Sequence, residues 1–239
     1  MDGFLILAIE TATGCGSVSL TRGGMNDFHL LAECTSQPDI THSRRLLGSV
    51  EWLMNGTGVH WDDLDAIAIS TGPGSFTGLR IGMAAAKSIA MATNSSLVGI
   101  PTLDALAYCT GVRNRLLCCL LDARKKQVYA GFYRTDDNGR PVRISDPVVV
   151  NPEKLLAGID EPVMLVGSGA RVYRDCFRDC QQIEIVQDYI TMPRAMYVGL
   201  LAGEKLEKGE ILDPLTAAPM YVRTSEAEVN LKRKQLEKT

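Results

Sequence analysis

A glycine-rich segment, STGPGSFTGLRIG at residues 70–82, holds the glycine and hydroxyl residues that can cradle phosphate groups. It joins a strand predicted over residues 65–71 to a helix predicted over residues 77–92. The spacing fits neither standard phosphate-binding pattern. A P-loop needs a lysine directly after its second glycine, but here Leu79 follows Gly78. The dinucleotide-binding pattern Gly-x-Gly-x-x-Gly, begun at Gly72, would need its third glycine at position 77, but that glycine is at 78. The loop is therefore interpreted mainly as structural, with direct nucleotide binding as the weaker alternative.

Two acids, Glu10 and Asp122, each end an apolar strand and are the best candidates for acid–base or metal chemistry. With Thr11 they are weak candidates for holding ATP and magnesium in a cleft. Acids at strand ends also form turns and bind backbone groups, and this structural interpretation is favoured.

The remaining residue types give no catalytic set. The chain has three histidines, and none has a second histidine three or four residues away, as a helical metal pair requires. The Gly-x-Ser-x-Gly pattern of a nucleophile elbow is absent from the sequence. We expect no catalytic residue and no metal site.

The elements that must position these residues occur in the same order twice. Strand-like and helix-like segments follow the order β-β-β-α-β-α-β-α over residues 1–110 and again over residues 111–223, and a polar tail follows at 224–239. This duplication resembles the actin-like/Hsp70/sugar-kinase (ASKHA) superfold of class α/β. In that superfold paired acids and glycine turns hold ATP and magnesium between the halves.

Small residues recur every fourth position along the helix predicted at 77–92, at Gly78, Gly82, Ala86 and Ala90. This spacing puts them in one row on one helix face, which permits close approach of another backbone. The row packs either against the sheet of its own chain or against a helix of a partner. Both interpretations stay open at this point.

Charge and composition exclude several classes of protein. The 239 residues carry a formal net charge of −3, which disfavours a surface dedicated to coating nucleic acid. The basic clusters at 124–126 and 232–234 are interpreted as solvated. No signal-peptide pattern and no membrane-spanning stretch is found in the sequence. The seven cysteines are interpreted as reduced side chains of a cytoplasmic protein.

Several segments closely resemble the TsaB (YeaZ) family and together cover nearly the whole chain in the right order. They lie at residues 6–13, 72–82, 101–107, 121–124 with 128–129, and 218–223. The resemblance implies a bacterial protein that acts in forming the threonylcarbamoyl group on N6 of adenosine 37 in ANN-decoding tRNAs.

The resemblance further implies a non-catalytic relative of TsaD, the subunit that transfers the threonylcarbamoyl group. TsaD carries a metal-binding His-x-x-x-His, whereas the matching segment here begins with His42 and has Leu46 in the second histidine position. The implied partners are TsaD in a heterodimer, the ATPase TsaE, and a second copy of the chain in isolation. Contact with tRNA is implied only through the complex. ATP or ADP and magnesium are implied only in the complex, and no membrane is implied.

Members of the family pair through helices of the first half, which correspond to the helices predicted at 41–54 and 77–92. We therefore expect the partner contact to comprise His42, Leu46, Leu47, Val50, Leu53, Met54, Gly78, Leu79, Gly82, Met83 and Ala86. On this view, Gly82→Leu abolishes pairing and leaves the chain folded. The alternatives are an ATP-binding enzyme of the same superfold and, least favoured, a glycoprotease-like metallopeptidase.

Overall fold

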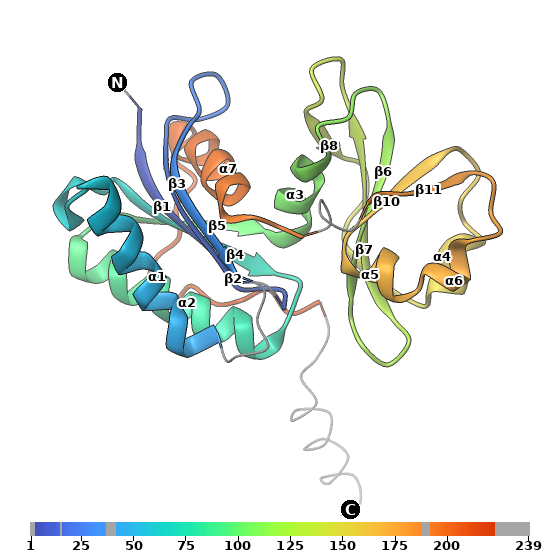
Figure 1. Cartoon of the computed structure of the whole chain (residues 1–239), viewed down its shortest axis with the longest axis horizontal. Coiled ribbons are helices and arrows are strands. Elements are labelled where there is room, and N and C mark those ends of the chain that lie inside the picture. The colour runs from blue at the N-terminus through green and yellow to red at the C-terminus, as the bar shows by residue number, and fades with distance from the viewer. Residues whose placement is uncertain (1–2, 15, 37–41, 188–191, 223–239) are drawn as a thin grey trace, which may run out of the picture.

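In a computed structural model, which describes residues 3–14, 16–36, 42–187 and 192–222, the chain forms two mixed β-sheets (Figure 1). The strands of the first sheet are β1 (Leu5–Glu10), β2 (Gly16–Arg22), β3 (His29–Ser36), β4 (Ala66–Gly72) and β5 (Ser96–Pro101), in the order β3-β2-β1-β4-β5. The first three strands are antiparallel, and β4 and β5 extend the sheet in parallel. Every residue of the central strand β1 is buried, as its continuous apolar sequence predicts.

The second sheet repeats this arrangement. Its strands are β6 (Leu116–Asp122), β7 (Val128–Thr135), β8 (Pro141–Arg143), β9 (Val148–Val150), β10 (Val163–Val166) and β11 (Ile183–Ile185). The order is β11-β10-β6-β7-β8, with β9 also paired to β7. The repeated element order predicted from the sequence is therefore confirmed.

Two predicted elements of the second half are each divided. The strand predicted at 142–150 is two short strands, β8 and β9. Between them the side chain of Ser145, not a backbone carbonyl, accepts the hydrogen bond from the backbone N–H of Phe132. Pro147 has no N–H to donate, so the backbone pairing with β7 is interrupted there. The helix predicted at 170–178 is two short helices, α5 (Ser168–Val172) and α6 (Arg174–Phe177). A further short helix, α4 (Pro152–Leu156), begins at a proline, as predicted.

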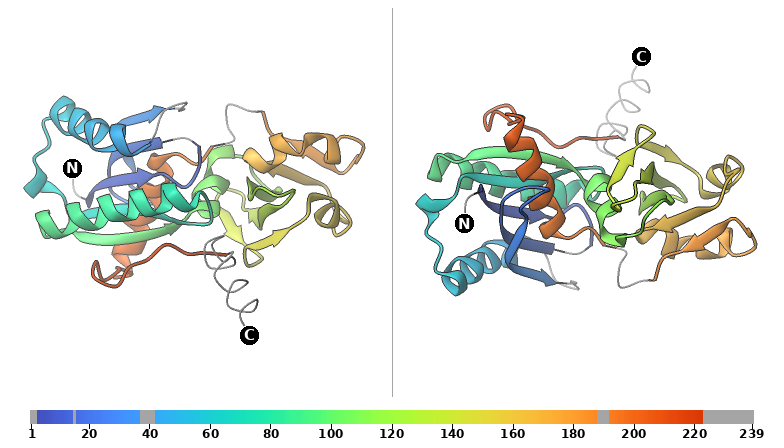
Figure 2. Two further views of the ribbon diagram at one scale, coloured as in Figure 1. Left: turned by 90° about the horizontal axis from the view of Figure 1, so that it is seen from below. Right: turned by 90° about the horizontal axis from the view of Figure 1, so that it is seen from above.

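Three helices cover the first sheet. Helices α1 (His42–Thr57) and α2 (Phe76–Thr93) pack on one face, and α7 (Ala195–Glu207) crosses the opposite face (Figure 2). Alternate residues of β1 serve the two layers: Leu7 lies in the core beneath α1 and α2, whereas Ile6 lies beneath α7. Among the described residues, no helix is long and apolar enough to cross a lipid bilayer.

Helix α7 follows β11 in the sequence but packs on the first sheet. The predicted division into halves at 1–110 and 111–223 is therefore wrong for this helix. The short helix α3 (Thr102–Ala107), which follows β5, lies between the two sheets. Its Leu103, Leu106 and Ala107 pack against β6 and β7, whereas Ala105 lies in the core beneath α7. Residues 210–222 also return to the first sheet, where the backbone N–H of Leu212 bonds to Leu97 and that of Met220 bonds to Thr71.

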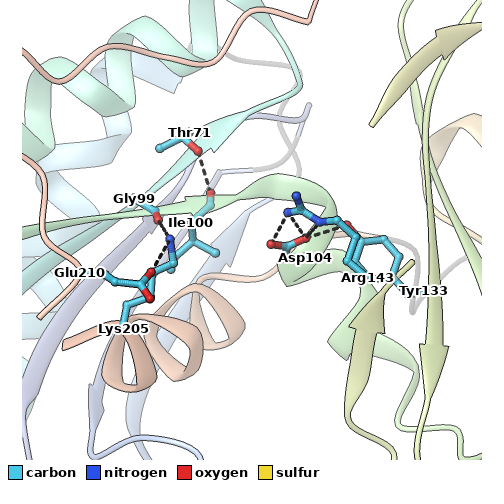
Figure 3. Close-up of polar contacts among 8 residues, drawn as sticks. All are labelled: Thr71, Gly99, Ile100, Asp104, Tyr133, Arg143, Lys205 and Glu210. Atoms are coloured by element: carbon cyan, nitrogen blue, oxygen red, sulfur yellow. Dashed lines mark hydrogen bonds and ion pairs between the residues drawn. The ribbon is translucent and has the colours of Figure 1, made fainter. Parts of the chain in front are cut away.

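A partly exposed polar cluster fixes α3 to the second sheet (Figure 3). The carboxylate of Asp104 accepts hydrogen bonds from the Tyr133 hydroxyl at 2.7 Å and from Arg143 Nε at 3.0 Å. From α7, Lys205 Nζ donates a hydrogen bond to the carbonyl of Gly99 in β5 at 3.1 Å. The connection between the halves is therefore held by side chains from both of them.

The row of small residues on α2 faces the end of β1 in the same chain. A Cβ added at Gly78 would lie 2.0 Å from the Thr11 carbonyl oxygen, and one added at Gly82 would lie 2.1 Å from Thr11 Oγ1. The Thr11 hydroxyl donates a hydrogen bond to the Gly78 carbonyl at 2.8 Å. Of the two interpretations of this row, packing against the chain's own sheet is the correct one.

This contact predicts the effect of one added methyl group. Gly82→Ala should lower the free energy of unfolding by about 3 kcal/mol, because its Cβ overlaps Thr11. The matched control is Gly48→Ala on α1, where nothing lies within 4 Å of the added Cβ. This control should raise the free energy of unfolding by about 0.5–1 kcal/mol. Urea denaturation compares the two variants, and equal effects would contradict the observed packing of α2.

Candidate functional site

The principal cleft lies between the two halves and has a volume of about 520 Å³. One wall comes from residues 12–14 after β1 and residues 73–77 at the start of α2. The other wall comes from residues 121–124 at the end of β6, from Tyr129, and from residues of α5. Residues 220–222 complete one side. The cleft therefore brings together segments from both halves of the chain, as the repeated fold predicts.

The first wall is rigid because β1 and α2 share hydrogen bonds. The backbone N–H of Ser75 donates to the Ala12 carbonyl at 2.6 Å, and the Ser75 hydroxyl caps α2 by accepting from the Gly78 N–H at 3.3 Å. Gly74 lies so close to Ala12 that an added Cβ would be 2.2 Å from its carbonyl oxygen. The glycines of the segment at 70–82 thus serve close backbone packing, as the favoured structural interpretation predicted.

The second wall ends in an unusual turn. Arg124, Lys125 and Lys126 are consecutive non-glycine residues with positive φ angles of 59°, 52° and 58°. Asp122 Oδ1 accepts hydrogen bonds from the backbone N–H of Arg124 at 2.8 Å and from the Tyr173 hydroxyl at 3.1 Å. The Asp122 carboxylate therefore holds the turn, which we name the basic turn (residues 124–126).

An aromatic rim stands at the mouth of the cleft. The rings of Phe76 and Tyr221 lie 5.2 Å apart, and the guanidinium of Arg80 lies 4.0 Å from the centre of the Phe76 ring. Arg80 Nε also donates to the Tyr221 hydroxyl at 2.9 Å. These contacts bind residues 220–222 to the start of α2.

Glu10 does not line the cleft. Its side chain is fully buried at the end of β1, where it accepts hydrogen bonds from the Ser70 hydroxyl and from the backbone N–H of Ala12. Burial raises the pKa of Glu10 to about 7, and these hydrogen bonds only partly oppose the rise. Thr11 is buried as well and bonds to α2. Of the three weak nucleotide-site candidates, the structure places only Asp122 in the cleft.

The acids therefore do not suit a bound ATP–magnesium group. Glu10 is shielded from the cleft, and one oxygen of Asp122 is already shared by two protein donors. Within the described ranges, no group of three or more histidine, cysteine or acidic residues could hold a metal ion. The cleft offers cations and hydroxyls instead: Arg124, Arg171, Ser75 and Thr77. Sequence reasoning did not find Arg171, because no local pattern marks it.

Most of the residues predicted to contact a partner lie in the core of the chain itself. Buried in this way are Leu46, Val50, Leu53, Met54, Leu79, Met83 and Ala86, together with Gly78 and Gly82. The prediction that these residues form an open contact surface is therefore wrong, because the apolar face of each helix packs on the first sheet. Leu47 is exposed. The side chain of His42 lies outside the described residues.

The burial of Gly82 also overturns the expected behaviour of Gly82→Leu. Any side chain at this position would overlap Thr11 and Ile69. The substitution would therefore disturb the chain's own fold and cannot test a partner contact.

Comparisons with known proteins show which family this chain resembles. A family model described as "TsaD: tRNA N6-adenosine threonylcarbamoyltransferase" matches residues 33–231. The chain is 28% identical over 228 residues to "tRNA threonylcarbamoyladenosine biosynthesis protein TsaB" of Escherichia coli strain K12, covering 93% of this chain and 96% of that protein. The protein of the same name from Bacillus subtilis strain 168 is 28% identical over 227 residues, again covering 93% and 96%.

Two solved structures resemble this chain in fold. "YeaZ from Pseudomonas aeruginosa" superposes with a TM-score of 0.76 and 26% identity, covering 91% of this chain and 99% of that one. Component A of the (R)-2-hydroxyglutaryl-CoA dehydratase of Acidaminococcus fermentans has a TM-score of 0.51 at 9% identity, covering 85% of this chain and 99% of that one, a likeness of fold alone. The predicted fold class, with duplicated halves of the actin-like/Hsp70/sugar-kinase type, is confirmed.

The buried carboxyl group predicts a pH dependence of stability. Because the pKa of Glu10 is higher in the folded than in the unfolded chain, the folded state loses stability as pH rises from about 4.5 to about 7. This loss is about 3 kcal/mol from this group alone, at about 1.4 kcal/mol for each pKa unit. Glu10→Gln removes the titration and keeps an acceptor for Ala12. Urea denaturation should therefore show that, from pH 5 to pH 8, the free energy of unfolding of the variant rises by about 3 kcal/mol relative to that of the unmodified chain. A constant difference at the two pH values would contradict the burial of the charge.

Proposed function

The chain belongs to the TsaB (YeaZ) family, and from that premise we propose that it takes part in the biosynthesis of threonylcarbamoyladenosine in tRNA as a non-catalytic scaffold subunit. In this proposal it pairs with a TsaD subunit, which transfers the threonylcarbamoyl group, and it works with the ATPase TsaE. In isolation the same surface pairs two copies of the chain.

The observation that carries the proposal is the outer face of α1 and α2. Three large apolar side chains stand out from these helices into solvent: Leu47 is 59% exposed, Trp52 is 64% exposed and Met91 is 59% exposed. On α2, the small side chains of Ala84 and Ser88 are also exposed, and their spacing puts them on the same helix face as Met91. Exposed tryptophan and methionine side chains beside small residues suit a helix-to-helix contact between subunits.

This outer face replaces the contact residues expected from the sequence. The same two helices are involved, but the anchors are the side chains that point away from the first sheet. Hot spots in interfaces are enriched in tryptophan, so Trp52 is the proposed central anchor. His42 remains part of the proposed contact by its position in the sequence.

The use of the two strand-end acids supports a scaffold rather than an enzyme. Glu10 and Asp122 bind groups of the protein itself, so neither carboxylate is arranged to hold magnesium. The ATP-binding enzyme remains the second candidate, favoured by the volume of the cleft and its two arginines. Calorimetric titration with ATP–magnesium separates the two, because the scaffold predicts weak or no binding by the isolated chain.

The partner surface predicts a specific loss of pairing. Trp52→Glu should weaken binding to TsaD from the same organism at least about 30-fold, since removing a hot-spot side chain costs about 2 kcal/mol or more. The control is Ile144→Glu, which changes an apolar side chain of similar exposure in the second half. Light scattering after size exclusion, on each chain alone and mixed with TsaD, measures the loss.

Two results would overturn the proposal. One is a complex that forms equally well with Trp52→Glu and with Ile144→Glu. The other is the absence of any complex between the unmodified chain and TsaD.

A further inference from the structure

We infer that the basic turn, together with Arg171 and the aromatic rim, forms a binding site for an unpaired RNA loop. That the RNA is a tRNA rests on the proposed function, whereas the binding chemistry rests on the cleft itself. The inference assigns direct RNA contact to this chain, which the sequence expected only through the complex. It also revises the interpretation of residues 124–126 as merely solvated.

The first argument is the backbone of the basic turn. Left-handed conformations cost about 1–2 kcal/mol for each non-glycine residue, and glycine or asparagine would adopt them more readily. Here three long cationic residues adopt them in succession, and all three are exposed. Their conformation is fixed by Asp122 and by a hydrogen bond from the Gln127 N–H to the Arg124 carbonyl at 3.0 Å. Strain that the surroundings hold in place is typical of functional positions.

The second argument is the charge of the cleft. Its charged lining residues, among those described, are Arg124, Arg171 and Asp122. Because Asp122 Oδ1 accepts two hydrogen bonds from the protein, that negative charge is partly compensated from within. Lys125 and Lys126 follow Arg124 directly in the basic turn and are exposed. Because the whole chain carries a formal net charge of −3, attraction for a polyanion requires local groups of cations such as this one.

The third argument is the aromatic rim. Phe76 is 37% exposed and Tyr221 is 41% exposed. Unpaired bases stack on such rings, and each stacked base contributes about 1–3 kcal/mol. Arg80 already lies against the Phe76 ring and holds the Tyr221 hydroxyl, so the rim is preorganised.

An RNA loop fits this site better than a free nucleotide with magnesium. A nucleotide triphosphate would need carboxylates for its metal, and the two strand-end acids are engaged elsewhere. The backbone N–H of Arg124, which could otherwise bind a phosphate, is used by Asp122. What the site offers are cationic side chains on an exposed turn and stacking surfaces at its mouth. This combination suits single-stranded RNA, whose phosphates and unstacked bases lie side by side.

The test is fluorescence anisotropy of the full chain with a labelled, unmodified anticodon stem–loop that carries an ANN anticodon. Lys125→Gln combined with Lys126→Gln should weaken binding about tenfold. The salt dependence should also become shallower, with the logarithmic slope falling by about 0.7 for each phosphate that the variant no longer neutralises. The matched control is Arg113→Gln combined with Arg115→Gln, which removes two exposed cations at the opposite end of β6.

A second variant tests the rim. Phe76→Ala should weaken binding of the stem–loop but leave binding of a fully paired duplex of the same length unchanged, because paired bases cannot stack on the ring. Melting curves should show that each variant is folded.

The inference is overturned if the lysine variant and its control bind alike, or if duplex and loop respond equally to Phe76→Ala. It is also overturned if ATP–magnesium binds the cleft and the stem–loop does not. Light scattering with TsaD is run on the same variants. Retained pairing with unchanged RNA binding would remove only this inference, whereas loss of TsaD binding by the unmodified chain would remove the proposed function.

Discussion

The rest of the structure depends on the close contact between the end of β1 and the first turns of α2. The Thr11 carbonyl lies against Gly78, the Thr11 hydroxyl lies against Gly82, and the Ala12 carbonyl accepts from the backbone of Ser75. Because interiors are densely packed, such a contact tolerates almost no added volume. It fixes where α2 begins, and with it the first wall of the cleft and the position of Phe76. The glycine-rich segment thus places a site that other residues complete.

The exchange of helices between the halves extends this constraint across the molecule. In each half the helix after the last parallel strand reaches the other half, since α7 packs on the first sheet and α3 lies between the two sheets. Asp104 and Lys205 anchor the exchanged helices through hydrogen bonds to the opposite half (Figure 3). Residues 210–222 then return along β5 and reach the mouth of the cleft. The cleft is therefore bounded by segments that the exchange binds together, which favours a fixed shape over an open hinge.

Periodicity predicted the elements of this fold well but not what each element faces. Helices α1 and α2 lie within a few residues of their predicted limits, and the repeated element order is observed. Gly78 and Gly82 were correctly placed on one face of α2. That face contacts Thr11, more than sixty residues earlier in the chain, and no local pattern encodes so distant a contact. The same limit explains α7, whose apolar residues suit either sheet. The positive φ angles at Arg124, Lys125 and Lys126 were also beyond prediction, because these residues rarely adopt them and Asp122 and Tyr173 impose them.

Helix α2 connects the two proposed surfaces. Phe76 and Arg80, at its start, form the aromatic rim of the cleft, whereas Met91, near its end, belongs to the outer face beside α1. An 18-residue helix is about 27 Å long at 1.5 Å per residue, so a partner on the outer face leaves the cleft mouth accessible. The inward side of the same helix is fixed to β1 by its glycines. In the proposed function, this helix holds a partner and a loop of RNA at a set distance from each other, a role that requires no catalytic group of its own.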